Sequence, residues 1–565
     1  MRTKNRNSSA KLICGLLCGL ALFSGGLSAE PLIFFRAIVN SASFMPADGP
    51  GGAIARGSIF TMFGRDIGPA AGAQVSSFPL GTTFEGVSIE VTQGDVTVNA
   101  IPIFVSSGQL SAIMASDAPL GRVSVRLTFD GEQSNATPVT IVENSVGIFT
   151  ATVSGIGPGI IQNFVSQTVQ PFNTPSGAAR PGQVVTMWAT GLGPITGPDG
   201  AAPPVGSLPF DVEIFVGGKT VTRLLYAGRA PCCSGVDQFV FETPADSPEG
   251  CYVPVHVRVG GSAVSNTVTM AIQKDGDACS EPDNPFTQTF LEGGAVGAIT
   301  LARTLIESDV DVLSPSTFTV DQAAGYFRQE TGGVFAFNPY FALPPAGACT
   351  AYSRSGNLLA GIPIPFVPAA GLDAGELSLN GPNGAAELLR TVTGDSTDYD
   401  PTLVGGPEGI SDTQDAPLYL SPGNYGVTGE GGADIGAINA DADVSDAPQW
   451  TNSGDFTEVS RGDDVTFTWT APGAARVVVA GVSVDRPSNA SGMFLCLAPA
   501  DSTSLRVPST VLANLPASRS SLGQSDGFFI LGSWPTGAVE ILTADGLDQA
   551  AVMVQSIHSK TVRFR

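Results

Sequence analysis

The sequence predicts an all-β protein: tandem antiparallel sandwiches followed by a β-rich C-terminal region. Three observations predict it, namely the composition, an internal repeat and the period of the apolar residues. The chain has 565 residues, including 69 glycines and 42 prolines, and 14% of its residues are charged. Such a composition is typical of many short strands joined by tight turns. A chain of this length is too long for one hydrophobic core and should divide into several domains.

A stretch of thirteen residues recurs 125 positions further along the chain. GSIFTMFGRDIGP at residues 57–69 matches GQVVTMWATGLGP at residues 182–194. In both copies the last glycine is followed by proline, and neither copy has the lysine of a phosphate-binding loop. A phosphate site would also need a helix directly after the glycines. We therefore interpret both copies as a strand that ends in a turn.

The similarity continues beyond this stretch, which indicates two homologous domains. The further matching pairs are 85–91 with 210–216 and 119–135 with 247–266. The second pair ends in Ser-Asn in both copies. We predict one domain at residues 32–145 and a second at residues 150–275.

Apolar residues in both copies alternate with a period of two, which predicts half-buried strands. The inward residues of the first copy are Val123, Val125, Leu127 and Phe129. Those of the second copy are Val253, Val255, Val257 and Val259, with Pro254, His256 and Arg258 facing outward. Turn signals recur every 8 to 12 residues or so, so each copy is expected to form a sandwich of roughly seven strands.

The remaining chain divides into two predicted segments. Residues 276–345 read as a linker and mixed segment, with a short helix expected at 321–327. Strand patterns dominate residues 346–565, where Val465, Phe467 and Trp469 alternate with threonines. One further short helix is predicted at 507–518.

Several motifs resemble a family of secreted bacterial proteins, abundant in Acidobacteria, that is built on paired immunoglobulin-like sandwich domains. The motifs are AIVNSASF at residues 37–44, the two copies of the repeated stretch, and YAGRAP at residues 226–231. The resemblance covers about residues 36–280. It implies tandem immunoglobulin-like domains and export, and it supplies no catalytic residue. More loosely, the C-terminal half resembles regions that accompany such domains.

The N-terminus has the pattern of a signal peptide. Four basic residues precede an apolar run at residues 12–23, and small residues follow up to Ala29. The run is shorter than the roughly 20 residues that span a bilayer, which disfavours a membrane anchor. We predict removal of residues 1–29, export to the extracellular space or cell surface, and no membrane span in the mature chain.

Charge excludes one class of partner. The full chain carries a net charge of −24, and residues 1–29 hold four basic and no acidic residues, so the mature charge is −24 − 4 = −28. Three lysines remain, at positions 219, 274 and 560. Nucleic acid is therefore not expected as a partner.

The mature chain has six cysteines, an even number that predicts disulfides in an exported protein. They are Cys232, Cys233, Cys251, Cys279, Cys349 and Cys496. The simplest division pairs the first four locally and joins Cys349 to Cys496, although four cysteines allow three connectivities. Zinc is the alternative, but the adjacent Cys232 and Cys233 lack zinc-knuckle spacing.

Two acidic clusters are the candidate metal ligands. Their members are Asp395, Asp398, Asp400, Asp441, Asp443 and Asp446. Carboxylates at such close spacing could hold calcium in a secreted loop, although neither cluster follows the EF-hand pattern. A solvated acidic loop is the favoured interpretation, and no other cofactor is expected.

Catalytic patterns are sparse. Residues 523–527 match G-x-S-x-G, and Asp545, Asp548 and His558 follow in the order of a hydrolase triad. A strand rather than a helix is predicted after this motif, which argues against a nucleophile elbow. His256 and His558 are the two histidines of the chain, and we interpret both as surface residues.

Arg461-Gly462-Asp463 is an RGD tripeptide of the kind that some adhesins present. It leads directly into a predicted strand, so Gly-Asp is interpreted as a turn.

These observations predict an exported, non-catalytic surface or extracellular protein with a binding or structural role. A surface polysaccharide or a protein is the expected ligand. The alternative is an extracellular hydrolase in which the sandwiches are accessory domains and the C-terminal half carries a pair of carboxylates.

Overall fold

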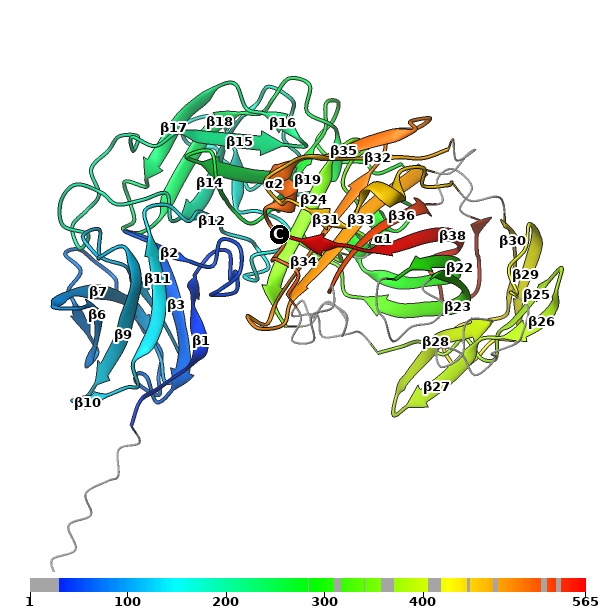
Figure 1. The fold of residues 1–565 in the computed structure, drawn as a ribbon, viewed down its shortest axis with the longest axis horizontal. Helices are drawn as coiled ribbons and strands as arrows, with labels where there is room; N and C mark the ends of the chain where they lie inside the picture. Colours follow the sequence, from blue (N-terminus) through cyan, green and yellow to red (C-terminus); the bar gives the residue numbers. More distant parts are fainter. Residues whose placement is uncertain are drawn as a thin grey trace, which may run out of the picture.

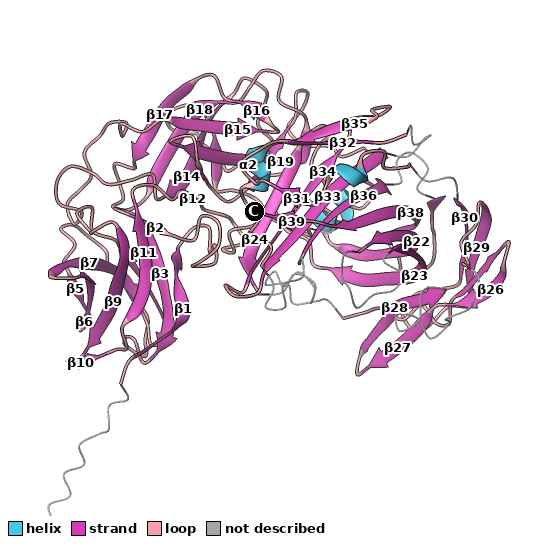
Figure 2. Cartoon of the chain, in the orientation of Figure 1, coloured by secondary structure: helices cyan, strands magenta, loops and turns pink. Residues whose placement is uncertain are grey.

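The regular secondary structure is almost entirely β-strand, with two short α-helices in the described part of the chain (Figure 1, Figure 2). A computed structural model describes residues 30–282, 284–308, 317–339, 341–356, 370–404, 418–444, 448–470, 476–519, 526–534 and 540–565, with backbone alone for 401–404, 534 and 540. The predicted signal peptide at 1–29, Asp446 and residues 523–525 lie outside the described residues. Within them, no helix has the length and apolar character that crossing a membrane requires.

The first repeat is a sandwich whose strands run from residue 32 to residue 142. They are β1 (Leu32–Asn40), β2 (Ile54–Ala55), β3 (Ile59–Arg65), β4 (Ala73–Gln74), β5 (Thr83–Phe84), β6 (Val87–Gln93), β7 (Val96–Val105), β8 (Gln109–Ile113), β9 (Gly121–Phe129), β10 (Glu132–Gln133) and β11 (Thr137–Val142). Their main order is β1-β3-β8-β7-β6-β9-β11-β2. The first half of β7 pairs with β6 and its second half with β8, so this strand passes from one layer to the other.

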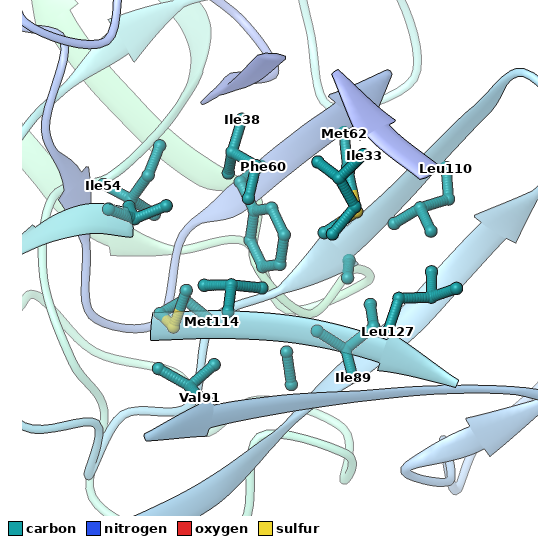
Figure 3. Close-up of a cluster of buried hydrophobic side chains, with 14 of the residues drawn as sticks. Ile33, Ile38, Ile54, Phe60, Met62, Ile89, Val91, Leu110, Met114 and Leu127 are labelled. Carbon is teal, nitrogen blue, oxygen red and sulfur yellow. The ribbon is translucent and has the colours of Figure 1, made fainter. Parts of the chain in front are cut away.

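The core of the first repeat lies between these layers (Figure 3). Val123, Val125 and Leu127 of β9 are at most 3% exposed, while Arg122 and Arg126 on the other face are exposed. The predicted alternation of this strand is confirmed.

The second repeat is a sandwich of two separate sheets. Its strands are β12 (Gly147–Ile148), β13 (Ile161–Asn163), β14 (Val184–Thr190), β15 (Val212–Val216), β16 (Lys219–Thr220), β17 (Leu224–Arg229), β18 (Asp237–Glu242), β19 (Gly250–Val259), β20 (Ala263–Val264) and β21 (Val268–Ile272). One sheet has the order β12-β14-β18-β17 and the other β16-β15-β19-β20, while β13 joins β14 and β21 joins β19.

The repeated stretch forms the same strand in both domains. β3 and β14 occupy the same seven positions at the offset of 125 residues. Phe60 and Met62 are fully buried in the first copy, as are Val185 and Met187 in the second. The chain therefore consists of tandem immunoglobulin-like sandwiches followed by a β-rich region, as predicted from the alternation and the repeat.

The C-terminal region is built on a large sheet. Its elements are α1 (Thr287–Glu292), β22 (Gly294–Glu307), β23 (Thr317–Glu330), β24 (Cys349–Ser355), β25 (Ser378–Gly381), β26 (Gly384–Glu387), β27 (Leu389–Thr393), β28 (Ser396–Val404), β29 (Gly423–Gly429), β30 (Ile438–Val444), the 3-10 turn η2 (Ser453–Asp455), β31 (Glu458–Val459), β32 (Val465–Thr468), β33 (Arg476–Asp485), β34 (Ala490–Leu497), β35 (Ser504–Val507), α2 (Ser509–Leu512), β36 (Gly527–Trp534), β37 (Glu540–Ile541), β38 (Gln549–Thr561) and β39 (Arg563–Phe564). The large sheet has the order β24-β34-β33-β36-β38-β22-β23-β28-β27, and β37 joins β38.

Smaller sheets cover this large sheet and create two cores. The sheet β26-β25-β29-β30 contributes Leu379 and Tyr425 to a core shared with Ile299 of β22. The pair β32-β35 contributes Phe467 to a second core, which it shares with Val479 and Phe529. Apolar faces on two layers supply the burial that stabilises such an arrangement.

The predicted boundary at residue 346 is wrong. Strand β22 pairs in parallel with β38 and along its whole length with β23, so β22 and β23 lie in the middle of the large sheet. The helix predicted at 321–327 is part of β23. Only tertiary pairing reveals this role, because β38 lies more than 240 residues further along the sequence.

The outward face predicted for β19 is also wrong. His256 is 4% exposed and stacks on Phe215 with ring centroids 4.9 Å apart. Tyr252, on the same strand face, is 3% exposed and packs against Phe337 of the C-terminal region. The alternation gave the inward residues correctly, but it could not show that neighbouring side chains and another region cover the second face.

Candidate functional site: the junction of the three β regions

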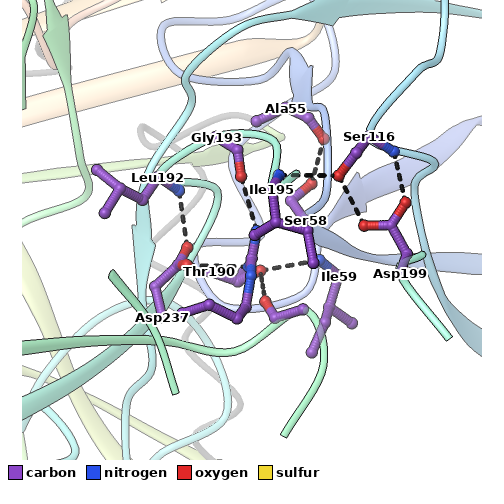
Figure 4. A network of polar contacts seen from close by, with 12 residues as sticks. Ala55, Ser58, Ile59, Ser116, Thr190, Leu192, Gly193, Ile195, Asp199 and Asp237 are labelled. Atoms are coloured by element: carbon purple, nitrogen blue, oxygen red, sulfur yellow. Dashed lines mark hydrogen bonds and ion pairs between the residues drawn. The ribbon is translucent and has the colours of Figure 1, made fainter. Parts of the chain in front are cut away.

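The two repeats are joined by polar contacts that start from the repeated stretch (Figure 4). The main-chain N–H of Ile59 in β3 donates to Thr190 Oγ1 at the end of β14, 2.8 Å away. The Thr190 hydroxyl in turn donates to the main-chain oxygen of Gly235, at 2.6 Å. One copy of the stretch therefore binds the other across the domain boundary.

A buried ion pair lies beside this contact. Arg229 Nη1 is 2.9 Å from Asp237 Oδ1, and their side chains are 2% and 0% exposed. Arg229 also donates through Nη2 to the main-chain oxygen of Gly193, and Asp237 accepts the N–H of Leu192. Burial raises the pKa of the Asp237 carboxyl to about 6, although the charge of Arg229 acts in the opposite direction.

The loop that follows β14 is held to the first repeat by a second set of bonds. Asp199 accepts both the N–H and the hydroxyl of Ser116, at 2.7 and 2.6 Å. The Ser116 hydroxyl accepts the N–H of Ile195. Beneath these bonds an apolar cluster contains Ile59, Ile101 and Ile113 of the first repeat, with Phe149 and Val236 of the second. The junction therefore combines apolar burial with satisfied polar groups.

The C-terminal region contacts both repeats. Phe337 packs between Tyr252 of the second repeat and Tyr352 of β24, with ring centroids 6.0 Å apart in each pair. On the first repeat, Arg36 pairs with Asp48 and donates to the main-chain oxygen of Pro487. The three β regions therefore contact one another pairwise.

A cavity of about 430 Å³ lies where these three regions meet. Its wall is formed by Pro50, Gly51, Ala53, Val142, Asn144, Ser145, Ser262, Ala263, Val264, Arg461, Gly462, Ala513 and Arg565. The charged members of this wall are two arginines, although the whole chain has a net charge of −24. This volume lies within the range of about 300 to 1,000 Å³ that small-molecule sites occupy.

Arg461 of the RGD tripeptide belongs to this wall rather than to a freely presented loop. Its Nε and Nη1 atoms donate to the main-chain oxygens of Arg565 and Leu515, at 3.1 and 2.8 Å. Burial, reinforced by the charge of Arg519, lowers the pKa of Arg461. Arg565 forms an ion pair with Glu458. The tripeptide leads into β32 through a turn.

The acidic clusters do not form a metal centre in the described residues, where no three His, Cys, Asp or Glu side chains are gathered. Asp398 pairs with Arg328, and Asp400 accepts a hydrogen bond from Thr391. Asp443, on the separate strand β30, accepts one from Asn424. Asp395 lies in the turn between β27 and β28, Asp441 lies on β30, and Asp446 is outside the described residues.

The histidines are not the surface residues that the sequence predicted. Burial lowers the pKa of His256 to about 4, and the charge of Arg258 adds to this effect. His558 Nε2 lies 2.8 Å from Glu307 Oε1, and Lys560 contacts the other oxygen of that carboxylate. Parallel pairing of β22 with β38 brings these residues together from distant parts of the chain.

The residues of the hydrolase motif that the structure describes have other partners. Asp548 accepts the main-chain N–H of Ala295, and His558 contacts Glu307 rather than Asp545 or Asp548. The serine of this motif, Ser525, lies outside the described residues.

The cysteines form three disulfides: Cys232–Cys233, Cys251–Cys279 and Cys349–Cys496. The last joins the edge strand β24 to its neighbour β34, and the second lies beside Tyr252 at the contact with the C-terminal region. The first closes a ring between neighbouring residues in the loop between β17 and β18, at the junction of the two repeats.

No protein-family model matches this sequence, and no curated protein sequence matches it either. Among solved structures, a tetra-tandem repeat of the extending region of a large adhesion protein is 10% identical, with coverage of 93% of this chain and 98% of that one and a TM-score of 0.14. Domains 5–6 of the S-layer protein SbsC are 11% identical over 44% of this chain and all of that one, with a TM-score of 0.16. Similarity this weak carries no functional argument.

The sequence did not reveal the junction as a site. Arg229 and Asp237 flank the Cys232-Cys233 dipeptide, and Arg229 is part of the YAGRAP motif. The one signal in the sequence was an arginine and an aspartate next to apolar strands. Charged residues are rarely buried without a partner, so such a pair can indicate a buried ion pair. The partners themselves lie on different elements, so their contacts follow from the tertiary structure.

Proposed function

We propose that this chain is an exported, non-catalytic protein of the extracellular space or cell surface, which belongs with the secreted tandem-sandwich proteins that it resembles. Its role in this proposal is to bind a glycan that carries a single anionic group. The observation that carries the proposal is the arginine-lined cavity between the three β regions.

The charge of the wall favours an anion. Arg461 and Arg565 line the cavity, and among the residues that the structure describes no aspartate or glutamate contributes to the wall. Burial of the Arg461 guanidinium is costly, and a bound carboxylate or sulfate would offset that cost through charge-assisted hydrogen bonds. The arginine fork suits both groups.

The charge of the whole chain limits the ligand. A net charge of −28 after removal of residues 1–29 repels a long anionic polymer. A mainly neutral glycan with one terminal acidic sugar would avoid most of this repulsion. The remaining lining, which includes Ala53, Val142 and Val264, would contact the apolar face of the sugar ring.

Other charged residues of the C-terminal region support a scaffold role rather than catalysis. Its carboxylates are paired with arginines in four well-formed contacts: Arg303–Asp321, Arg390–Asp373, Arg486–Asp526 and Arg519–Asp485. Carboxylates held in this way stabilise strands, whereas glycoside hydrolysis needs two that face a bound sugar.

The test is a pull-down of residues 30–565 with insoluble neutral polysaccharides and with the same polymers carrying terminal uronate or sulfate groups. The variant Ser262→Glu adds a negative charge at the cavity rim, where Ser262 is exposed. Its control is Thr220→Glu, on exposed β16 of the same repeat. We expect the acid-bearing polymers to retain the wild-type protein. Retention of Ser262→Glu should be at least about tenfold weaker, and retention of Thr220→Glu should equal that of the wild type. Equal retention of all three proteins would contradict the cavity as the site.

The supernatant of the same experiment tests the hydrolase alternative. Soluble sugar released by the wild-type protein would replace the binding proposal with an enzymatic one. The search for its residues would then begin with the carboxylates of the C-terminal region.

A further inference from the structure

We propose that the Cys232–Cys233 disulfide is a thiol–disulfide exchange site, whose redox state controls how firmly the two repeats are held together. The proposal is independent of the proposed ligand. It depends on the accessibility of this disulfide and on its position in the loop between β17 and β18, which contacts the first repeat.

Cys232 is the accessible half of the pair. It is exposed, Cys233 and Cys279 are half-buried, and Cys251, Cys349 and Cys496 are at most 7% exposed. Exchange requires that an attacking thiolate reach a sulfur atom, so the most exposed disulfide is expected to react first. The Cys232 sulfur is the predicted point of attack.

The loop that contains this pair is a closed turn at the repeat junction. The N–H of Ala230 donates to the oxygen of Val236, and the N–H of Cys233 donates to the oxygen of Ala230. Arg229 and Asp237, the buried ion pair, stand directly before and after the turn. Release of the disulfide removes a covalent constraint on two consecutive residues within it.

The far side of the turn touches the first repeat. Gly235 supplies the oxygen to which Thr190 donates, and the same Thr190 oxygen accepts the N–H of Ile59. A Cβ atom added at Gly235 would lie 2.6 Å from Ile59 Cγ1, so no space separates the turn from β3. A small shift of the turn therefore disturbs the hydrogen bond of the Ile59 amide.

The proposed reductant is a dithiol. One thiolate of the dithiol attacks the Cys232 sulfur, breaks the Cys232–Cys233 bond and releases the Cys233 thiolate, leaving a mixed disulfide. The second thiol of the reductant then displaces Cys232 and closes the reductant into a cyclic disulfide. Two electrons pass to the protein, both cysteine sulfurs take up a proton at neutral pH, and the dithiol is oxidised.

The test treats oxidised residues 30–565 with increasing dithiothreitol, blocks the thiols with N-ethylmaleimide and locates the label by peptide mass. We expect Cys232 and Cys233 to be labelled before any other cysteine. Hydrogen exchange is then measured in the peptide that contains the Ile59 amide, with the β9 peptide as the internal reference. We expect exchange at Ile59 to accelerate at least about tenfold, with β9 unchanged.

A matched variant separates the switch from general destabilisation. The double variant Cys232→Ser/Cys233→Ser replaces both thiols with hydroxyls of similar size. Its Ile59 amide is expected to exchange as fast as that of the reduced wild type, with or without dithiothreitol. Labelling of another disulfide first, or an Ile59 rate that is the same in the oxidised and selectively reduced proteins, would overturn the proposal. The wild-type comparison decides the matter even if the variant fails to fold.

Discussion

Asn135 and Asn266 form the same bonds in the two repeats. Each side chain accepts the main-chain N–H of an isoleucine near the start of its own domain and donates to that residue's oxygen: Ile33 for Asn135 and Ile148 for Asn266. The preceding serines, Ser134 and Ser265, each accept an N–H from the neighbouring strand. The repeated Ser-Asn dipeptide therefore fastens the first strand of each sandwich.

Replacement of these asparagines should cost different amounts of stability. Asn266 is 4% exposed and donates also to Gly155, whereas Asn135 is exposed. We expect Asn266→Ala to lower the free energy of unfolding by about 2–3 kcal/mol and Asn135→Ala by about 1 kcal/mol, because buried unsatisfied groups cost more. Denaturant unfolding measures both, with Asn99→Ala on an exposed position of β7 as the control. Equal losses of unfolding free energy in the two variants would show that burial does not determine how much each asparagine stabilises its repeat.

Removal of one partner of the buried Arg229–Asp237 pair should destabilise the second repeat strongly. We expect Arg229→Ala to cost about 3–5 kcal/mol, because it leaves Asp237 without its charge partner in an environment that excludes water. Arg223→Ala, directly before the same strand β17, is the matched control, since its pair with Glu242 is largely exposed and should contribute at most about 1 kcal/mol. Guanidinium unfolding of both variants checks the expectation, and similar losses would refute it.

Stability should fall below neutral pH because of His256. Its pKa is lowered from 6.5 to about 4 by burial, so the unfolded chain binds a proton at a pH where the folded protein does not. The contribution of His256 to the free energy of unfolding therefore does not change with pH above about 6.5, and it becomes unfavourable as the pH falls toward 4. Relative to His256→Phe, the wild type should lose about 2 kcal/mol between pH 8 and pH 5.

The measurement is the difference in unfolding free energy between wild type and His256→Phe across this pH range. Asp237, whose raised pKa acts with the opposite sign, is present in both proteins and cancels from the difference. A difference that does not change with pH would mean that the pKa of His256 is the same in the folded and unfolded protein.

Calcium should not stabilise the protein through the acidic clusters. Asp398, Asp400 and Asp443 already have partners, and their two strands belong to different sheets. We expect the melting temperature to be the same in millimolar calcium and in chelator. A rise on calcium addition that chelator reverses would show that these carboxylates, or Asp446, bind the ion.

The sequence by itself determined the strands and the repeat. A period of two requires that alternate residues face a core, and this property of Val123, Val125 and Leu127 survives any arrangement of the domains. The offset of 125 residues likewise placed β3 and β14 at equivalent positions. Both are local patterns, which the order of residues contains directly.

Only the tertiary structure decided which surfaces stay exposed and which segments share a sheet. His256 looked outward because alternation cannot register that Phe215 lies over it, and β22 looked like part of a linker because its partner β38 is far along the chain. The arginine-lined cavity and the contact between Ile59 and Thr190 likewise need three separate regions to come together. Burial and proximity are properties of the folded chain, since they depend on residues that the local pattern does not include.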